Sequence, residues 1–251
     1  VRILGSILEK GIASELIVLD SFGFTEVNII FMVKYKIDLH THSILSYDGG
    51  ISRQEYINAI NDKTLDYIAI TDHNEIDFAL KLHGEYPKNI IIGEEIMTND
   101  GEIIGLFLTK LIPKHLSVPK TIELIKEQGG LVYIPHPFDL LRAGLGEDLL
   151  KIHLNDIDII EIFNARTKLT GFDKTAKKYA EKQNLVSSSS TDAHIYLTLG
   201  KAYNIVGGPI TKDNLVLNLR SGDKKEVYAT ALKEKFAPVI NVILNLFRRR
   251  R

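Results

Sequence analysis

The chain has 251 residues, of which 45% are hydrophobic and 25% are charged, a composition typical of a globular enzyme built around one core. Its formal net charge of −1 gives no bulk attraction to nucleic acid or to an acidic membrane surface. The sequence contains no cysteine, which excludes disulfides and thiolate metal sites, so any metal must be held by imidazole and carboxylate groups. A cytoplasmic location is the default expectation.

The first 31 residues differ from the rest of the chain. Met32 begins "MVKYKIDLHTHS", which would serve as a protein start. We therefore interpret residues 1–31 either as the product of a start codon placed too far upstream or as an extension packed outside the main domain. The segment lacks a basic region followed by a long apolar run and a small-residue cleavage site, so a signal peptide is not expected.

Residues 32–230 alternate short apolar runs with helical patterns, which predicts parallel strands joined by helices in one α/β barrel domain. Helices are expected over "SRQEYINAINDK", where Ser52 and Glu55 have capping-box spacing, and over "PKTIELIKEQGG". Two more are expected over "FDKTAKKYAEKQN" and "KDNLVLNLRSG". The predicted strands are 35–39, 66–70, 89–94, 103–108, 131–135, 157–162, 186–190 and 202–206.

Residues 231–251 form a distinct C-terminal segment that contains "FAPVINVILNLFRRRR". Its apolar part, residues 236–247, is shorter than the about 20 residues needed to span a bilayer, so no integral membrane segment is expected. The pattern favours a closing helix packed on the barrel with a solvated polybasic end. Contact of the basic tail with a membrane surface or with RNA is the alternative.

Polar residues come directly after most of the predicted strands. In an α/β barrel the active site lies at the carboxyl ends of the strands, so these residues are expected to converge. His40 and His42 alternate with Leu39 and therefore point into the same cavity. The polar residues that follow the other predicted strands are His73, Glu94 with Glu95, His136, Asn164 with Arg166, and Asp192 with His194. Because each unpaired buried charge costs several kcal/mol, a group of so many polar residues at the strand ends favours a functional site over a structural one.

The motifs "DLHTHS…YDG", "ITDHN", "GEE", "PHPFD", "EIFNAR" and "STDAH" run in order from about residue 36 to residue 206. Taken together, they resemble the PHP (polymerase and histidinol phosphatase) superfamily of metal-dependent phosphoesterases. The resemblance implies a distorted TIM-like (β/α)7 barrel of the PHP type. It also implies two or three divalent metal ions, usually zinc, manganese or iron, and magnesium is a further candidate.

The resemblance also implies which residues bind the metals. His40, His42 and Asp192 would hold one ion, and Glu95 would bridge it to a second ion that also takes His136. Asp48, His73 and His194 would hold a third. Glu94 is the alternative to Glu95. The residues expected to carry catalysis through these ions are His40, His42, Glu95, Asp192 and His194.

The sequence departs from the family pattern in one strand. Many members have another histidine in the strand after the glutamate, whereas this strand reads "GEIIGLFL". The second metal is therefore expected to have fewer protein ligands, and two firmly held ions are the safer expectation. His83, His115 and His153 fall in loop or helix contexts and are expected at the surface.

Three residues are candidates for substrate binding. Arg142 and Arg166 are expected to contact phosphate, because a guanidinium fork matches phosphate geometry, although each also fits a surface ion pair. Asn164 is expected to position the substrate or to cap a turn. Asp38 and Asp72 are expected to orient the ligating histidines, or to serve as ordinary hydrogen-bonding turn residues.

The leading hypothesis is a metal-dependent phosphoesterase that hydrolyses a small phosphomonoester with metal-activated water. A nucleotide or the end of a short oligonucleotide is the favoured substrate class, and no GxxxxGK phosphate-binding loop is present. An amidohydrolase or deaminase, which also combines a barrel with an HxH motif, is the first alternative. A non-catalytic metal-binding or RNA-binding module is the second, and the terminal arginines favour it.

Overall fold

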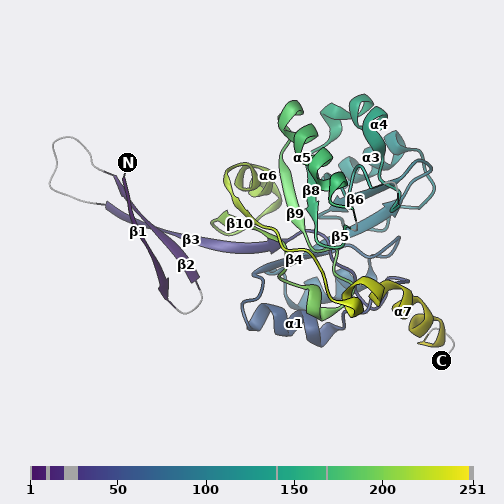
Figure 1. Cartoon of the computed structure of the whole chain (residues 1–251), viewed down its shortest axis with the longest axis horizontal. Coiled ribbons are helices and arrows are strands. Elements are labelled where there is room, and N and C mark those ends of the chain that lie inside the picture. Colours follow the sequence, from purple (N-terminus) through teal and green to yellow (C-terminus); the bar gives the residue numbers. More distant parts are fainter. Residues whose placement is uncertain (1, 10–11, 20–27, 140, 168, 249–251) are drawn as a thin grey trace.

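The computed structural model describes residues 2–9, 12–19, 28–139, 141–167 and 169–248 (Figure 1). Its centre is a nearly closed, barrel-like mixed sheet in which seven described strands are neighbours in chain order, so the predicted distorted TIM-like barrel is confirmed. These strands are β3 (Asn28–Asp38), β4 (Tyr67–Ile70), β5 (Ile90–Met97), β6 (Glu102–Leu106), β7 (Leu131–Ile134), β8 (Ile159–Asn164) and β9 (Ser187–Ser190). On the other edge of β3, β10 (Tyr203–Gly207) pairs with it antiparallel, and β11 (Asp223–Lys225) pairs with β10.

Two of the predicted strands run against their neighbours. β6 is antiparallel to both β5 and β7, and β10, at the predicted strand 202–206, is antiparallel to β3, whereas β3–β4–β5 and β7–β8–β9 pair in parallel. The expectation of parallel strands was therefore wrong for β6 and β10. Only residues 98–101 separate β5 from β6, which is too short for the crossover that parallel strands need. Gly101 closes this turn with a φ of 148°, and a Cβ there would lie 2.7 Å from the Ala143 carbonyl oxygen. The reversal puts the start of β6 beside the carboxyl ends of the other strands.

The two outermost parallel strands meet beyond their ends. A bridge joins Thr41 to Ala193, where the His42 amide donates to the Ala193 carbonyl at 2.8 Å. The Asp192 amide donates to the His40 carbonyl at 2.9 Å. We call this junction the β3–β9 seam. It joins backbone that is far apart in sequence at the residues predicted to bind metal.

Six helices of the described chain flank the sheet: α1 (Arg53–Asn61), α2 (Asp77–Glu85), α3 (Val118–Glu127), α4 (Gly146–Ile152), α5 (Gly171–Gln183) and α6 (Lys212–Ser221). Short 3₁₀ turns occur at Leu154–Asp156 and Tyr196–Thr198. The predicted capping box of α1 is confirmed, since the Ser52 side chain accepts from the Glu55 amide and the Glu55 carboxylate accepts from the Ser52 amide. The other three predicted internal helices correspond to α3, α5 and α6.

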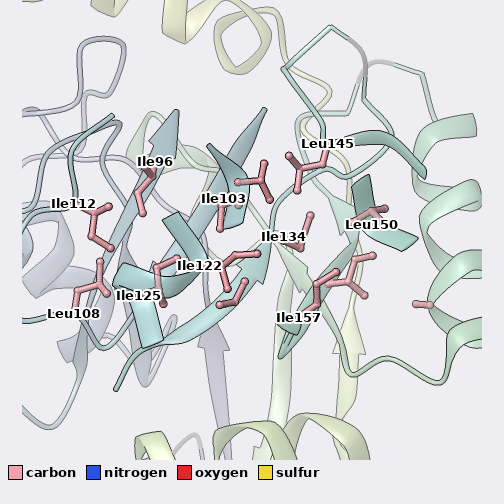
Figure 2. Packing of buried hydrophobic residues seen from close by; sticks show 14 of the residues in the cluster. Ile96, Ile103, Leu108, Ile112, Ile122, Ile125, Ile134, Leu145, Leu150 and Ile157 are labelled. Atoms are coloured by element: carbon pink, nitrogen blue, oxygen red, sulfur yellow. The ribbon is translucent and has the colours of Figure 1, made fainter. Parts of the chain in front are cut away.

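An isoleucine-rich cluster packs behind the rim of the barrel (Figure 2). Ile96 of β5 and Ile103 of β6 are paired in register and fully buried. Ile122 and Ile125 of α3 belong to the same cluster. Each such side chain contributes about 1.5–3 kcal/mol when removed from water. This packing anchors one face of the β5–β6 ribbon and leaves the alternate positions to face the barrel interior.

The N-terminal segment forms β1 (Arg2–Glu9) and β2 (Ile12–Leu19), which pair antiparallel, and β2 pairs in turn with the first half of β3. Figure 1 shows this hairpin projecting from the barrel. β3 continues without a break across the predicted boundary between residues 31 and 32. The upstream start codon stays a prediction.

The C-terminal helix α7 (Leu232–Arg248) lies beside the barrel. Its asparagines Asn241 and Asn245 are buried, whereas Val239 is 62% exposed and Leu246 57%. The expected closing helix therefore does contact the barrel, but through its polar face, and much of its apolar stretch is exposed. Among the described helices, none combines the length and apolarity needed to cross a bilayer. Residues 249–251 of the predicted basic tail lie outside the described residues.

Candidate metal centre

Five imidazoles meet at the rim formed by the strand ends. His40 and His42 follow β3, His73 follows β4, His136 follows β7, and His194 follows β9. All except His73 are buried, with at most 5% of the residue exposed. Their approach is close, since the His42 ring centroid is 4.6 Å from that of His73 and 4.2 Å from that of His194. The strand-end pattern in the sequence therefore does correspond to one spatial cluster.

Glu95 lies at the centre of this cluster. Its Oε2 atom is 3.2 Å from the Nε2 atoms of both His40 and His42. The same oxygen is 3.3 Å from Nδ1 of His73, and Oε1 is 3.1 Å from Nε2 of His136. One fully buried carboxylate thus contacts four imidazoles, which is the arrangement that a ligand shared between neighbouring cations requires.

Two carboxylates from other segments complete the neighbouring groups. Asp48 Oδ2 is 3.0 Å from Nε2 of His194, and ligand atoms of these two residues lie within 4.8 Å of those of His42 and His73. Asp192 Oδ1 is 3.2 Å from Nε2 of His42. The structure therefore brings together all eight residues that the sequence marked as metal ligands: His40, His42, Asp48, His73, Glu95, His136, Asp192 and His194.

The hydrogen-bonding pattern around His40 fits a bound cation. Its Nδ1 atom is 3.1 Å from a carboxylate oxygen of Glu161, so this nitrogen donates a proton to Glu161, and Nε2 is the nitrogen whose lone pair a cation would take once its proton is displaced. That Nε2 atom lies 3.1 Å from Nε2 of His42 and 3.2 Å from a Glu95 oxygen. Lone pairs directed at one another are unfavourable unless a proton or a cation lies between them. Imidazole and carboxylate donors of this kind suit zinc, manganese and iron.

Charge is strongly coupled across the cluster. Burial alone would lower the pKa of His40, but the carboxylates of Glu95, Asp192 and Glu161 outweigh burial and hold that pKa well above its ordinary value. Burial would likewise raise the pKa of Glu95, yet the imidazoles, His40 first, hold it well below its usual range. Protons on the imidazoles thus balance ionised carboxylates, and a divalent cation would displace those protons.

His194 behaves differently. Burial and the nearby guanidinium of Arg166 lower the pKa of His194 to about 4. This imidazole is therefore neutral at physiological pH, which is the form that binds metals.

Glu102 was missed by the sequence reasoning. Its carboxylate lies 3.2 Å from Nδ1 of His73 and 3.7 Å from Nε2 of His136, and its ligand atom groups with those of His73 and Glu95. The sequence reasoning expected fewer protein ligands at the second site because this strand lacks a histidine, and Glu102 is a further candidate ligand from the same strand. Glu102 is the first residue of β6, and because β6 is antiparallel its start lies at the rim. The sequence reasoning considered only residues at the carboxyl ends of strands and therefore did not include Glu102.

Glu94, the alternative to Glu95, points elsewhere. One of its carboxylate oxygens accepts from the Ile112 amide at 2.9 Å, and burial raises the pKa of Glu94 to about 8. Ligand atoms of Glu94 join none of the groups formed by the described residues. His83, His115 and His153 also lie outside these groups, as expected.

The two candidate arginines both contact Asp192. Arg142 Nη1 donates to Asp192 Oδ2 at 2.6 Å, and Arg166 Nη1 donates to Oδ1 at 2.9 Å. Each arginine keeps 18% of its side chain exposed and lines the adjoining pocket. Asn164 is fully buried and donates to Glu161 at 2.8 Å while accepting from Arg142 at 3.0 Å. Asn164 thus links the charged side chains of Glu161 and Arg142, and it is not among the residues that line the pocket.

The histidines are oriented by a residue that the sequence reasoning did not find. Glu161 accepts from His40 Nδ1, from the Tyr133 hydroxyl at 2.8 Å and from the His136 amide at 2.8 Å. A single charged residue inside the apolar run "IIEIF" was the available signal. By contrast, Asp38 accepts from the amide and hydroxyl of Thr191 and Asp72 from those of Ser43. These two aspartates fix the backbone at the strand ends, so the turn interpretation fits their contacts.

Helix α7 fixes two of the loops that carry candidate ligands. The Asn241 amide donates to the His194 carbonyl at 2.9 Å. The Asn245 amide donates to the carbonyls of Ser46 and Gly49 at 3.1 and 3.0 Å, on either side of Asp48. A buried backbone carbonyl needs such a partner, which is the physical reason that the polar face of α7 is turned inward.

A pocket of about 300 Å³ opens onto the cluster. Asp48, His73, Glu95, Glu102, His136 and Asp192 form its polar wall, and Met97, Leu141 and Ala143 add apolar atoms. Tyr47 stands at its mouth, half-exposed, with its ring centroid 4.9 Å from that of His73. The volume is at the small end for ligand pockets, so it fits a compact group such as a phosphoryl group with part of its ester.

Sequence comparison identifies related proteins. Residues 38–215 match the family model described as "PHP domain". The uncharacterized protein MJ0417 of Methanocaldococcus jannaschii is 37% identical over 175 residues, which is 67% of this chain and 69% of that protein. A Thermotoga maritima protein named "Probable histidinol-phosphatase" is 28% identical over 109 residues, covering 43% of this chain and 39% of its own length.

Solved structures share the fold. A two-domain Bacteroides vulgatus protein, described as containing a predicted PHP-like metal-dependent phosphoesterase, is 16% identical with a TM-score of 0.64, covering 83% of this chain and 70% of that one. The lesion-specific endonuclease PfuEndoQ of Pyrococcus furiosus is 18% identical with a TM-score of 0.55, covering 76% and 57%. At these identities the likeness concerns the fold.

Proposed function

Because the chain belongs to the PHP domain family, we propose that it is a metal-dependent phosphoesterase that hydrolyses a small phosphomonoester. The observation that carries the proposal is the position of Glu95, whose single carboxylate contacts four imidazoles beside a pocket lined by two arginines. The two guanidinium groups add positive charge beside the cluster, which suits an anionic substrate.

The ligand groups divide around Glu95. His40, His42 and Asp192 would hold one ion, Glu95 would share it with a second beside His136 and Glu102, and Asp48 with His194 would hold a third. Divalent ions held there would lower the pKa of a coordinated water molecule and neutralise charge on the phosphoryl oxygens. His73 lies within reach of the second and third groups.

The chain's own residues would then bind and orient the ester. Arg142 and Arg166 both line the pocket. Arg166 makes its contacts with Asp192 and His194 through Nη1, so the rest of its guanidinium would donate to the phosphoryl oxygens. Arg142 already donates to Asp139, Asn164, Thr167 and Asp192, so it would contribute positive charge. Both are held in place through Asp192. Glu161 keeps the proton of His40 on Nδ1, so that Nε2 stays available as a ligand.

For the substrate, we favour a nucleotide or the end of a short oligonucleotide. Tyr47, half-exposed at the pocket mouth, offers an aromatic face on which a base can stack. Two similar proteins are named as a probable histidinol-phosphatase and as a lesion-specific endonuclease, and these names support a phosphate ester as the substrate.

The test is a substrate panel with defined metals. Protein loaded with manganese, zinc, iron or magnesium is assayed against p-nitrophenyl phosphate, nucleoside monophosphates, short RNAs and cyclic amides. We expect metal-dependent phosphate release that His40→Ala and Asp192→Ala abolish and that chelation removes. Turnover of the amides alone would instead establish an amidohydrolase, and wild-type rates in both variants would refute the ligand assignment.

A further inference from the structure

Helix α7 presents an apolar face to solvent. Phe236, Val239, Ile240, Ile243, Leu244 and Leu246 are each between 47% and 62% exposed. Their spacing of three and four residues places them on one side of the helix. We call this set the α7 outer face. Isolated exposed apolar residues are ordinary, but a contiguous stripe along a helix marks an interaction surface.

The opposite, polar face of α7 is fixed against the barrel. Asn241 and Asn245 donate to carbonyls of the loops around His194 and Asp48, and both asparagines are buried. Gly50 packs against the same helix, since a Cβ there would lie 2.6 Å from the Asn241 amide nitrogen. Rotating the helix to bury its apolar side would break these contacts. The outer face is therefore held outward by the barrel itself.

The charge at the end of the outer face is of one sign. Residues 236–251 contain no aspartate or glutamate and end in four consecutive arginines, although the whole chain has a net charge of −1. A second copy docking through the same face would add the same positive charge and supply no carboxylate from it. An anionic lipid surface complements both features, because it takes up apolar side chains and attracts arginines.

We propose that α7 is a peripheral anchor that docks the protein on anionic lipid bilayers through its outer face, aided by the positive charge of the arginines at 248–251. This inference stands apart from the proposed reaction, since it uses no residue of the metal cluster. It places the pocket close to the lipid surface, because Asn245 also contacts the loop that carries Tyr47 at the pocket mouth.

The experiment measures flotation of the full chain with vesicles of phosphatidylcholine alone or with about one quarter phosphatidylglycerol. We expect binding to the anionic vesicles that falls as salt rises from about 0.1 to about 0.5 M. Replacing Arg248 to Arg251 by glutamine is expected to weaken it at least about tenfold. Ile240→Ser with Ile243→Ser is expected to weaken it to a similar degree.

The matched control is Leu217→Ser, since Leu217 is 72% exposed on α6, away from α7 (Figure 1). This variant should bind vesicles as the wild type does. Equal binding by the α7 serine variant, with an unfolding temperature like that of the wild type, would overturn the proposal. So would a wild type that ignores anionic vesicles but dimerises through the outer face, or one that binds RNA instead.

Discussion

Glu94 and Glu95 are adjacent glutamates on opposite faces of the β5–β6 ribbon, and both are fully buried. Glu95 faces the barrel interior, where imidazoles hold its pKa well below the usual range. Glu94 lies on the face that also carries Ile96 of the isoleucine-rich cluster (Figure 2), and burial raises its pKa to about 8. Both side chains are equally buried, so the opposite shifts in their pKa come from the groups that surround each carboxylate.

The difference teaches what makes a buried carboxylate a candidate ligand. A lone acid in an apolar setting becomes neutral, because ionisation without a partner is costly. An acid among imidazoles stays ionised and is ready for a cation. The alternation of a β-strand is enough to send two neighbours in sequence to these two environments.

The strongest test of this contrast is Glu95→Gln. The amide keeps the shape of the side chain but removes the charge that four imidazoles share. We expect turnover of the best phosphate ester to fall by at least about a thousandfold, with each 1.4 kcal/mol of lost transition-state stabilisation giving about tenfold. Metal content measured by mass spectrometry should fall as well. Unchanged metal content and turnover would remove Glu95 from the centre of the site.

Glu102→Ala extends the comparison to the strand paired with β5. Because Glu102 contacts His73 and His136 at one side of the cluster, we expect about a 10- to 100-fold loss of turnover and weaker binding of one ion. Titration of the apoprotein with zinc would show it. Glu123→Ala removes a 53%-exposed glutamate of α3 and serves as the control. If the two variants behave alike, Glu102 has no part in the site.

The smallest effect is expected for Glu94→Gln. At pH 6 the carboxyl group is protonated in the folded chain, so a neutral amide should change stability by only about 1 kcal/mol and leave turnover near wild type. Because the folded pKa is raised, wild-type stability is lost as pH climbs from about 4.5 to about 8. Between these pH values the free energy of unfolding of the variant, measured by chemical denaturation, should therefore rise relative to that of the wild type. A variant that loses ground at pH 9 would show that Glu94 is needed as an ion.

Much of the site could be predicted because side-chain parity at strand ends is a local property. His40 with His42, and Asp192 with His194, are each two apart and so share a face. The same reasoning failed for Glu102, since strand direction depends on the four-residue turn before it and not on the strand's own pattern. Glu161 was passed over because it lies inside an apolar run that reads as an ordinary strand.

The orientation of α7 could not be deduced from its own pattern. An amphipathic helix is ordinarily assigned with its apolar face toward the core. Here α7 packs against backbone carbonyls of the loops around Asp48 and His194. Asparagine side chains can donate hydrogen bonds to these carbonyls, and aliphatic side chains cannot. Which carbonyls remain open at a rim depends on the closed barrel, and no local signal in "NVILN" reports it.

The β3–β9 seam has a consequence for how the protein is made. His40 and His42 leave the ribosome roughly 150 residues before Asp192, and Asn245 emerges later still, so about ten to forty seconds of translation separate the first ligands from the last brace. A nascent chain therefore carries a bare imidazole pair that cannot close a coordination shell. A chain terminated before Asp192 would lack the carboxylate that accompanies His40 and His42, so we expect it to lose the ion that these three residues would hold.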